Sequence, residues 1–246
     1  MDRRSALSLL AMSMLGACGG GGTSTAESAT DTSSTPAAAP LNTTASTPVQ
    51  TPPAQPQAAA ALSPNIACWG DSLTDLYWSH VQTLYPDRQV FDGGVIGETS
   101  TQIEVRAVAD TAHRDWISVY WYGHNDFTKA AVPGNIAASI GALDPKNKAF
   151  IVMSLLNWAD NGERGTAVYD DIVNCNNILA DQYPDNFIDI HAYLVSLFNP
   201  NDPQDVQDHN NDLVPTSLRF DRIHLNDTGC DFVAAKIKEF ITNKGW

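Results

Sequence analysis

Basic residues are scarce in this chain. It holds 14 Lys and Arg against 28 Asp and Glu, a formal net charge of −14. Three of the acidic and two of the basic residues precede Asn65, so residues 65–246 carry 25 acidic side chains against 12 basic ones. Nucleic acids and anionic membrane surfaces are bound through clustered positive charge. The composition therefore argues against nucleic acid as a partner and against direct adhesion to an anionic membrane.

Cysteine is equally sparse, with four in 246 residues. Three of them, Cys68, Cys175 and Cys230, lie far apart at irregular spacings, which argues against a metal site. Three is also an odd number, so at most one disulfide can form among them, and we predict none in particular. Cys68 lies in an apolar segment and is expected to be buried as a small hydrophobic residue.

Aromatic residues are absent from residues 23–64. Ala, Ser, Thr and Pro make up 33 of these 42 residues, and only Glu27 and Asp31 are charged. Such a segment has almost nothing to bury and cannot offset the entropy lost on ordering. We predict that residues 18–64 form a flexible tether and that residues 65–246 form the folded domain.

A long apolar run is also missing. The start, MDRRSALSLLAMSMLGACGG, has a short basic region, an apolar run too short to span a bilayer permanently, and then small residues. This layout predicts a signal peptide over residues 1–17. Leu15-Gly16-Ala17-Cys18 resembles the lipobox of bacterial lipoproteins, which implies a lipid on Cys18 and a location in the cell envelope. An ordinary cleaved signal is the alternative, and export by the twin-arginine route stays open because of Arg3-Arg4.

Within the predicted domain, apolar strand-like segments alternate with helix-like ones. This order indicates βαβ units and a parallel sheet, and continuous apolar strands indicate helices on both faces. We predict the α/β class, a three-layer α/β/α sandwich with a flavodoxin-like five-stranded parallel sheet. The expected strands are 65–69, 89–91, 116–121, 148–154 and 186–190, and the expected helices are 74–85, 99–109, 135–142, 165–182 and 227–242.

Four short polar motifs follow strands or precede helices, where ligands bind in parallel α/β sheets. A serine hydroxyl there becomes a nucleophile if a neighbouring base takes its proton, although Ser72 taken alone could merely cap a helix. His224 suits the base because a free imidazole titrates near neutrality, and Asp221 could orient it. The motifs are Gly70-Asp71-Ser72-Leu73, Gly97-Glu98-Thr99, Gly123-His124-Asn125-Asp126 and Asp221-Arg222-Ile223-His224.

In this order and spacing, the four motifs resemble the signature blocks of the SGNH (GDSL-type) hydrolases, over essentially all of residues 65–246. The resemblance implies a serine esterase with the triad Ser72, Asp221 and His224. It also implies an oxyanion hole formed by Ser72, Gly97 and Asn125, with Gly94 as a rival to Gly97. No G-x-S-x-G motif occurs, which argues against the α/β-hydrolases. The implied two-step acyl transfer needs no metal or organic cofactor.

The sequence leaves the substrate open. An envelope location and aromatic residues near the site favour short acyl groups, such as O-acetyl, on glycans, with Trp158 and His124 as candidate substrate-lining residues. A lipase or arylesterase, or a non-catalytic surface-binding lipoprotein, are the alternatives. The acidic stretch Asn199–Asp212 lacks the glycine and glutamate of an EF-hand loop and is expected to be a solvated acidic loop rather than a calcium site. The oligomeric state is not predicted.

Overall fold

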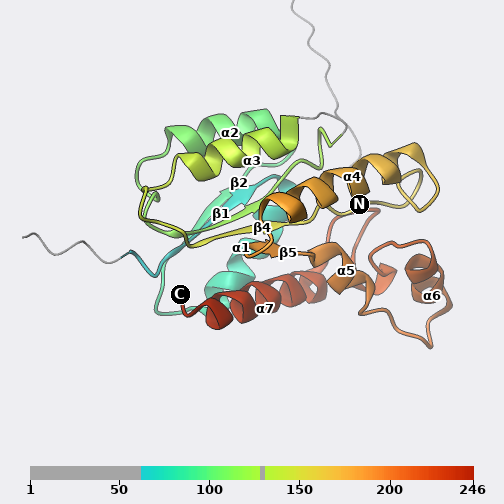
Figure 1. Cartoon of the computed structure of the whole chain (residues 1–246). Helices are drawn as coiled ribbons and strands as arrows, with labels where there is room; N and C mark the ends of the chain where they lie inside the picture. Colours follow the sequence, from blue (N-terminus) through green and yellow to red (C-terminus); the bar gives the residue numbers. More distant parts are fainter. Residues whose placement is uncertain (1–61, 128–130) are drawn as a thin grey trace, which may run out of the picture. The chain divides into compact units, whose positions relative to one another are not determined.

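The computed structural model describes residues 62–127 and 131–246, which contain a five-stranded parallel sheet (Figure 1). The predicted signal peptide, Cys18 and the part of the tether before Leu62 lie outside the described residues. The strand order is β2-β1-β3-β4-β5, so β2 lies on one side of β1, and β3, β4 and β5 follow in succession on the other. This sheet confirms the predicted fold class. Its strands are β1 (Ile66–Gly70), β2 (Val90–Gly94), β3 (Ile117–Trp121), β4 (Phe150–Met153) and β5 (Phe187–Ile188).

Helices cover both faces of the sheet, in three layers. In Figure 1, α2 and α3 lie above the sheet and α1 and α7 lie beneath it. The expected helices are observed, with small shifts at their ends, as α1 (Ser72–Leu84), α2 (Ser100–Ala109), α3 (Ala131–Gly141), α4 (Ala167–Gln182) and α7 (Asp227–Lys244). Three elements were not predicted, namely α5 (Ile190–Val195), α6 (Pro203–Asn210) and the 3₁₀ helix η1 (Thr216–Leu218).

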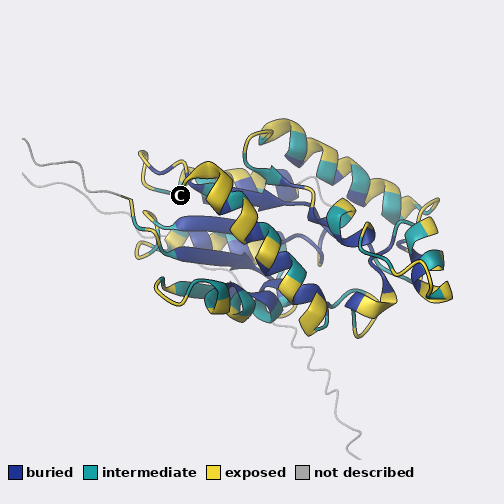
Figure 2. Ribbon diagram, turned by 90° about the horizontal axis from the view of Figure 1, so that it is seen from below, coloured by how far each residue is buried: buried dark blue, intermediate teal, exposed yellow. Residues whose placement is uncertain are grey.

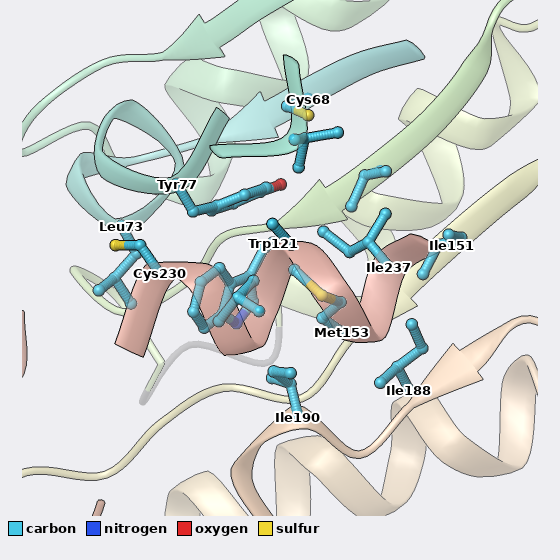
Figure 3. Packing of buried hydrophobic residues seen from close by; sticks show 14 of the residues in the cluster. Cys68, Leu73, Tyr77, Trp121, Ile151, Met153, Ile188, Ile190, Cys230 and Ile237 are labelled. Carbon is cyan, nitrogen blue, oxygen red and sulfur yellow. The ribbon is translucent and has the colours of Figure 1, made fainter. Parts of the chain in front are cut away.

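The two faces of the sheet bury two separate hydrophobic clusters. Every residue of β1 and β3 is buried (Figure 2). Successive side chains of a strand point to opposite faces of the sheet. One cluster joins the sheet to α1, α5 and α7, and Figure 3 shows Cys68, Trp121 and Met153 of the strands meeting Tyr77 and Ile237 of the helices. The other joins the sheet to α2, α3 and α4. This two-sided burial explains why the strands read as continuous apolar runs.

The cysteines of the described residues, Cys68, Cys175 and Cys230, are all free and buried. Burial raises the pKa of the Cys68 and Cys230 thiols to about 12 and that of Cys175 to about 11. These thiols therefore stay protonated at neutral pH and pack as small hydrophobic groups. Among the described residues, no helix is both long and apolar enough to cross a membrane, and no group of three or more His, Cys, Asp or Glu side chains could hold a metal ion.

The prediction of a solvated acidic loop over residues 199–212 is wrong. Its centre is α6, and two of its acidic side chains, Asp205 and Asp208, are almost fully buried. Their carboxylates are compensated by hydrogen bonds from the η1 segment, since the Ser217 hydroxyl donates to Asp205 at 2.6 Å and the Thr216 hydroxyl donates to Asp208 at 2.6 Å. A buried carboxylate is tolerated only with such partners.

Candidate active site

Ser72 lies where β1 passes into α1. The turn is tight: a Cβ atom at Gly70 would lie 2.4 Å from the Trp121 carbonyl oxygen, so only glycine fits there. The N-cap of α1 is Asp71, whose Oδ1 accepts the Leu73 N–H at 3.1 Å. The alternative that Ser72 serves as the cap is therefore wrong. Its Oγ is free to contact His224 instead, at 2.8 Å from the Nε2 atom.

The loop that precedes α7 brings an acidic group behind His224. The Nδ1 atom of His224 lies 2.7 Å from Asp221 Oδ2, and the other carboxylate oxygen accepts the backbone N–H groups of Ile223 at 2.8 Å and His224 at 2.7 Å. The structure thus brings Ser72, His224 and Asp221 into one hydrogen-bonded chain. This order of contacts matches the nucleophile, base and orienting acid of triad chemistry.

The pKa of the Asp221 carboxyl reflects two opposing influences. Burial alone would raise it, but the hydrogen bonds from Ile223 and His224 outweigh burial and hold the pKa below its ordinary value. Asp221 therefore stays ionised across the neutral range and offers His224 a permanent negative charge.

Three residues that could donate an N–H group to a substrate, Ser72, Gly97 and Asn125, line the same cleft. The Ser72 N–H is at the first turn of α1, where no carbonyl of the helix can accept it. Gly97 has a φ of +79°, a conformation that favours glycine, and it lines the cleft with Ser72 and Asn125. The Asn125 side-chain nitrogen donates one hydrogen to the Glu98 carbonyl at 2.9 Å, which leaves its second hydrogen for a substrate.

The backbone N–H of Gly94, the rival to Gly97, already has an acceptor. Its N–H donates to Asp92 Oδ1 at 2.9 Å, and a Cβ at this position would lie 2.3 Å from the Asp75 nitrogen of α1. The role of Gly94 is thus close packing of β2 against α1, and of the two glycines only Gly97 lines the cleft.

His124 is held behind the Ser72 turn rather than presented to a ligand. Its Nε2 atom accepts the Leu156 N–H at 3.1 Å, so the ring proton is on Nδ1 and is donated to Asp71 Oδ2 at 3.1 Å. The side chains of His124 and Asp71 are 4% and 0% exposed. His124 is among the residues that line the cleft, but neither of its ring nitrogens is left for a substrate. The pair fixes the loop of Asn125 against the turn of Ser72.

Trp158 lies in the loop after β4 and lines the same cleft, which has a volume of about 380 Å³. Its indole Nε1 donates to Asn161 Oδ1 at 3.0 Å, and its ring packs edge-on against Phe127. Asp160 and Asn161 both have positive φ angles, of 66° and 104°. Residues other than glycine adopt this conformation at a cost, and such strain gathers at ligand sites. The loop thus holds the Trp158 ring at the cleft.

The contacts that hold the Asp221 loop in place were not predicted from the sequence. Arg219 donates to the Asp221 carbonyl at 2.8 Å and to the Val214 carbonyl at 2.9 Å, while its other nitrogen pairs with Asp208 at 3.0 Å. The paired side chains of Arg219 and Asp208 are 11% and 3% exposed. The only sequence signal was the acidic stretch itself, because nothing in a sequence shows which of its carboxylates will meet an arginine.

We predict that Asp208→Ala lowers the free energy of unfolding by about 3–5 kcal/mol, because it leaves the buried Arg219 charge without its partner. The Thr216 N–H and hydroxyl also lose their acceptor. Urea unfolding measures the change. Asp171→Ala removes the same charge from an exposed position of α4 and is the control, with an expected change within about 0.5 kcal/mol. Equal effects of the two variants would show that the buried pair does not stabilise the fold.

Four of the residues that line the cleft lie at the carboxyl edge of the sheet. Ser72 follows β1, Gly97 follows β2, Asn125 follows β3 and Trp158 follows β4. The strand order reverses between β1 and β3, and this switch point is where open α/β sheets bind ligands.

Comparisons with solved structures identify the fold. The lipase/acylhydrolase from Enterococcus faecalis superposes with a TM-score of 0.56 at 17% identity, covering 74% of this chain and 96% of that one. A GDSL-like lipase from Bacteroides thetaiotaomicron gives 0.55 at 18% identity, covering 73% and 88%. An acetyl xylan esterase gives 0.56 at 20% identity, covering 71% and 98%. This chain has the SGNH hydrolase fold.

Sequence comparisons add less. No protein-family model matches the chain. The tail spike protein of Salmonella phage epsilon15 is 27% identical over 147 residues, which is 54% of this chain and 14% of that protein. The chain thus matches only a small part of that much longer relative.

Proposed function

We propose that this protein is a serine esterase that hydrolyses carboxylic esters through an acyl-enzyme. One observation carries the proposal: the hydrogen-bonded chain Ser72–His224–Asp221, with spacings of 2.8 and 2.7 Å, opens on a cleft that the Gly97 and Asn125 donors also line. A nucleophile, its base and an oxyanion site are the three groups that acyl transfer requires. Structures of similar fold are described as lipases, acylhydrolases and an acetyl xylan esterase, which supports the same class.

In the proposed mechanism each residue has a defined role. The Ser72 oxygen attacks the ester carbonyl carbon while His224 Nε2 takes the hydroxyl proton. The carbonyl oxygen becomes an oxyanion that accepts the N–H groups of Ser72, Gly97 and Asn125. His224 then gives the proton to the leaving alcohol, which departs and leaves an acyl-Ser72 ester. Water, deprotonated by His224 in its turn, attacks that ester and releases the acid. Asp221 supports the imidazolium in both steps.

Short acyl groups carried on a glycan, such as O-acetyl, are the substrate class we propose. The Trp158 ring beside the cleft supports it, because aromatic side chains supply flat, apolar contact area for ligands. Arg222 on the same cleft adds hydrogen-bond donors suited to a polar alcohol. A lipase or arylesterase of the same fold, or a binding protein without activity, are the alternatives that experiment must separate.

Chain-length selectivity and a glycan substrate together test the proposal. We expect hydrolysis of p-nitrophenyl acetate, little hydrolysis of p-nitrophenyl palmitate, and acetate release from O-acetylated xylan. Xylan from which the acetyl groups were first removed by alkali is the control. Preference for the palmitate would favour a lipase, and hydrolysis of p-nitrophenyl acetate without release from xylan would favour an arylesterase. Failure on every ester would indicate a binding protein.

We also propose that the domain is exported and held in the bacterial cell envelope by a lipid on Cys18. The support is the Leu15-Gly16-Ala17-Cys18 motif directly after the apolar run, followed by a segment suited to a tether. The net charge of −14 makes direct electrostatic binding to an anionic membrane unfavourable, so a lipid would supply the attachment.

We predict that the full chain, expressed in a bacterial host, incorporates radioactive palmitate and partitions into detergent. Cys18→Ser should abolish both, because the thioether forms on the cysteine sulfur. Cys175→Ser is the control, since the Cys175 thiol is buried in the fold and should leave labelling unchanged. Unlabelled wild-type protein recovered in the aqueous phase would contradict the lipid anchor.

A further inference from the structure

A second hollow adjoins the cleft at Ser72. It has a volume of about 290 Å³ and shares Ser72, Ile96, Asp221 and His224 with the cleft that Trp158 lines. Its remaining walls are Leu76, Phe220 and Asp75. The nucleophile therefore stands at the junction of two hollows of different character.

Two strongly exposed apolar side chains form this hollow. Ile96 is 72% exposed and Phe220 is 63% exposed, although large apolar side chains of the described residues are mostly buried. Exposed apolar groups that gather at one place mark a surface that binds something. These two lie on separate loops, after β2 and before α7, and both line the hollow beside Ser72 and His224.

The walls of the hollow are fixed by the fold. Leu76 stands one helical turn after Ser72 on the same face of α1. The loop that carries Ile96 is pinned by the Val95 N–H, which donates to the Gly70 carbonyl at 3.1 Å. The Phe220 ring stacks on the His224 ring with centroids 5.7 Å apart and an angle of 11° between the planes. A ligand would meet a preformed apolar surface and pay little ordering entropy.

The orientation of an ester at Ser72 decides which group enters this hollow. With the carbonyl oxygen directed at Ser72 N, Gly97 N and Asn125, the acyl chain and the alcohol must leave the carbonyl carbon on different sides. The side with Trp158 and Arg222 suits a polar alcohol, whereas the side with Leu76, Ile96 and Phe220 suits a hydrocarbon chain.

We propose that the hollow formed by Leu76, Ile96 and Phe220 is the acyl-binding subsite and selects neutral acyl chains of about four carbons over acetyl. This inference rests on the proposed esterase function and revises its substrate class: acetyl esters are still hydrolysed, but among short acyl groups a chain of about four carbons is preferred. The acidic side chain of Asp75 ends the apolar wall, so it disfavours acyl chains that end in a carboxylate, such as succinyl.

The test is the ratio of kcat/KM for p-nitrophenyl butyrate to that for p-nitrophenyl acetate. We expect a ratio of about five to ten in the wild-type protein, from two further methylene groups partly removed from water. Ile96→Ser and Phe220→Ser should each lower the ratio at least threefold. The ratio is taken within one preparation, so a change in the folded fraction or in the reactivity of Ser72 cancels.

Trp158→Ala is the matched control, because Trp158 lines only the opposite cleft. It should alter kcat/KM for both esters alike and leave their ratio unchanged. A wild-type ratio near one, an unchanged ratio in Ile96→Ser and Phe220→Ser, or a ratio lowered by Trp158→Ala would each overturn the subsite. Loss of the proposed function is distinguishable, since then neither ester would be hydrolysed by the wild-type protein.

Discussion

Replacing Ser72 with alanine is expected to lower kcat/KM for p-nitrophenyl acetate by about 10⁴-fold or more, the scale seen when a serine nucleophile is lost. The variant keeps the cleft and the N–H donors but has no oxygen to carry the acyl group. Its melting temperature should hardly change. The hydrogen bond of the Ser72 hydroxyl is to His224, and the residue that caps α1 is Asp71 rather than Ser72. Initial rates and thermal unfolding measure the two effects.

Ser79→Ala is the matched control for this result. Ser79 lies on the same helix, α1, with an exposed side chain away from the cleft, so the variant should keep wild-type kinetics. Residual activity of Ser72→Ala within about tenfold of wild type would show that another group is the nucleophile.

Unequal losses are expected for the other two members of the hydrogen-bonded chain. His224→Ala should lower kcat by about 10⁶-fold and Asp221→Asn by about 10⁴-fold. The asparagine can still accept the Ile223 and His224 N–H groups through its oxygen. Its nitrogen would then face His224 Nδ1 as a donor, which moves the ring proton to Nε2. That tautomer donates to Ser72 and cannot take its proton.

The pH profile separates this role from a structural one. Because the pKa of Asp221 is lowered, its charge is constant across the neutral range, and kcat/KM should rise with pH through a single acidic limb as the base that takes the Ser72 proton loses its own proton. Asp221→Asn removes the negative charge that favours the imidazolium, so the midpoint of that limb should move to lower pH. Each variant is compared at its own plateau. An unchanged rate and profile in Asp221→Asn would make the residue structural and reduce the triad to a dyad.

The fold was predictable because its strongest signals are local. Segments such as 116–121 and 148–154 read as strands buried on both faces, and the helices between them imply parallel crossovers. The last strand was predicted over 186–190, yet β5 spans only Phe187–Ile188 because Asp189 caps the new helix α5. Asp189 accepts the Ala192 N–H at 3.0 Å, and this helix cap was overlooked because the apolar residues on either side of Asp189 read as one strand.

The proposed reacting groups could be located from sequence because each belongs to a short motif that follows a strand or precedes a helix. The contacts that hold these groups in place could not be predicted from sequence, since they involve residues that are distant in the chain. His124 was a candidate substrate-lining residue, but the N–H of Leu156, 32 residues further along the chain, donates a hydrogen bond to its Nε2 atom. Asp208 looked solvated until the fold brought Arg219 and Thr216 to it. The exposure of Ile96 and Phe220 could not be predicted from sequence either, because apolar side chains are expected to be buried.

The most direct test of the central claim, that His224 activates Ser72 as a nucleophile, is covalent labelling by a fluorophosphonate. The Ser72 oxygen would attack phosphorus, fluoride would leave, and mass spectrometry of the digested protein would locate the adduct. We predict one adduct, on Ser72, formed quickly by the wild-type protein and at least about 10³-fold more slowly by His224→Ala. An adduct on another residue, or equal labelling rates in the two proteins, would contradict the account.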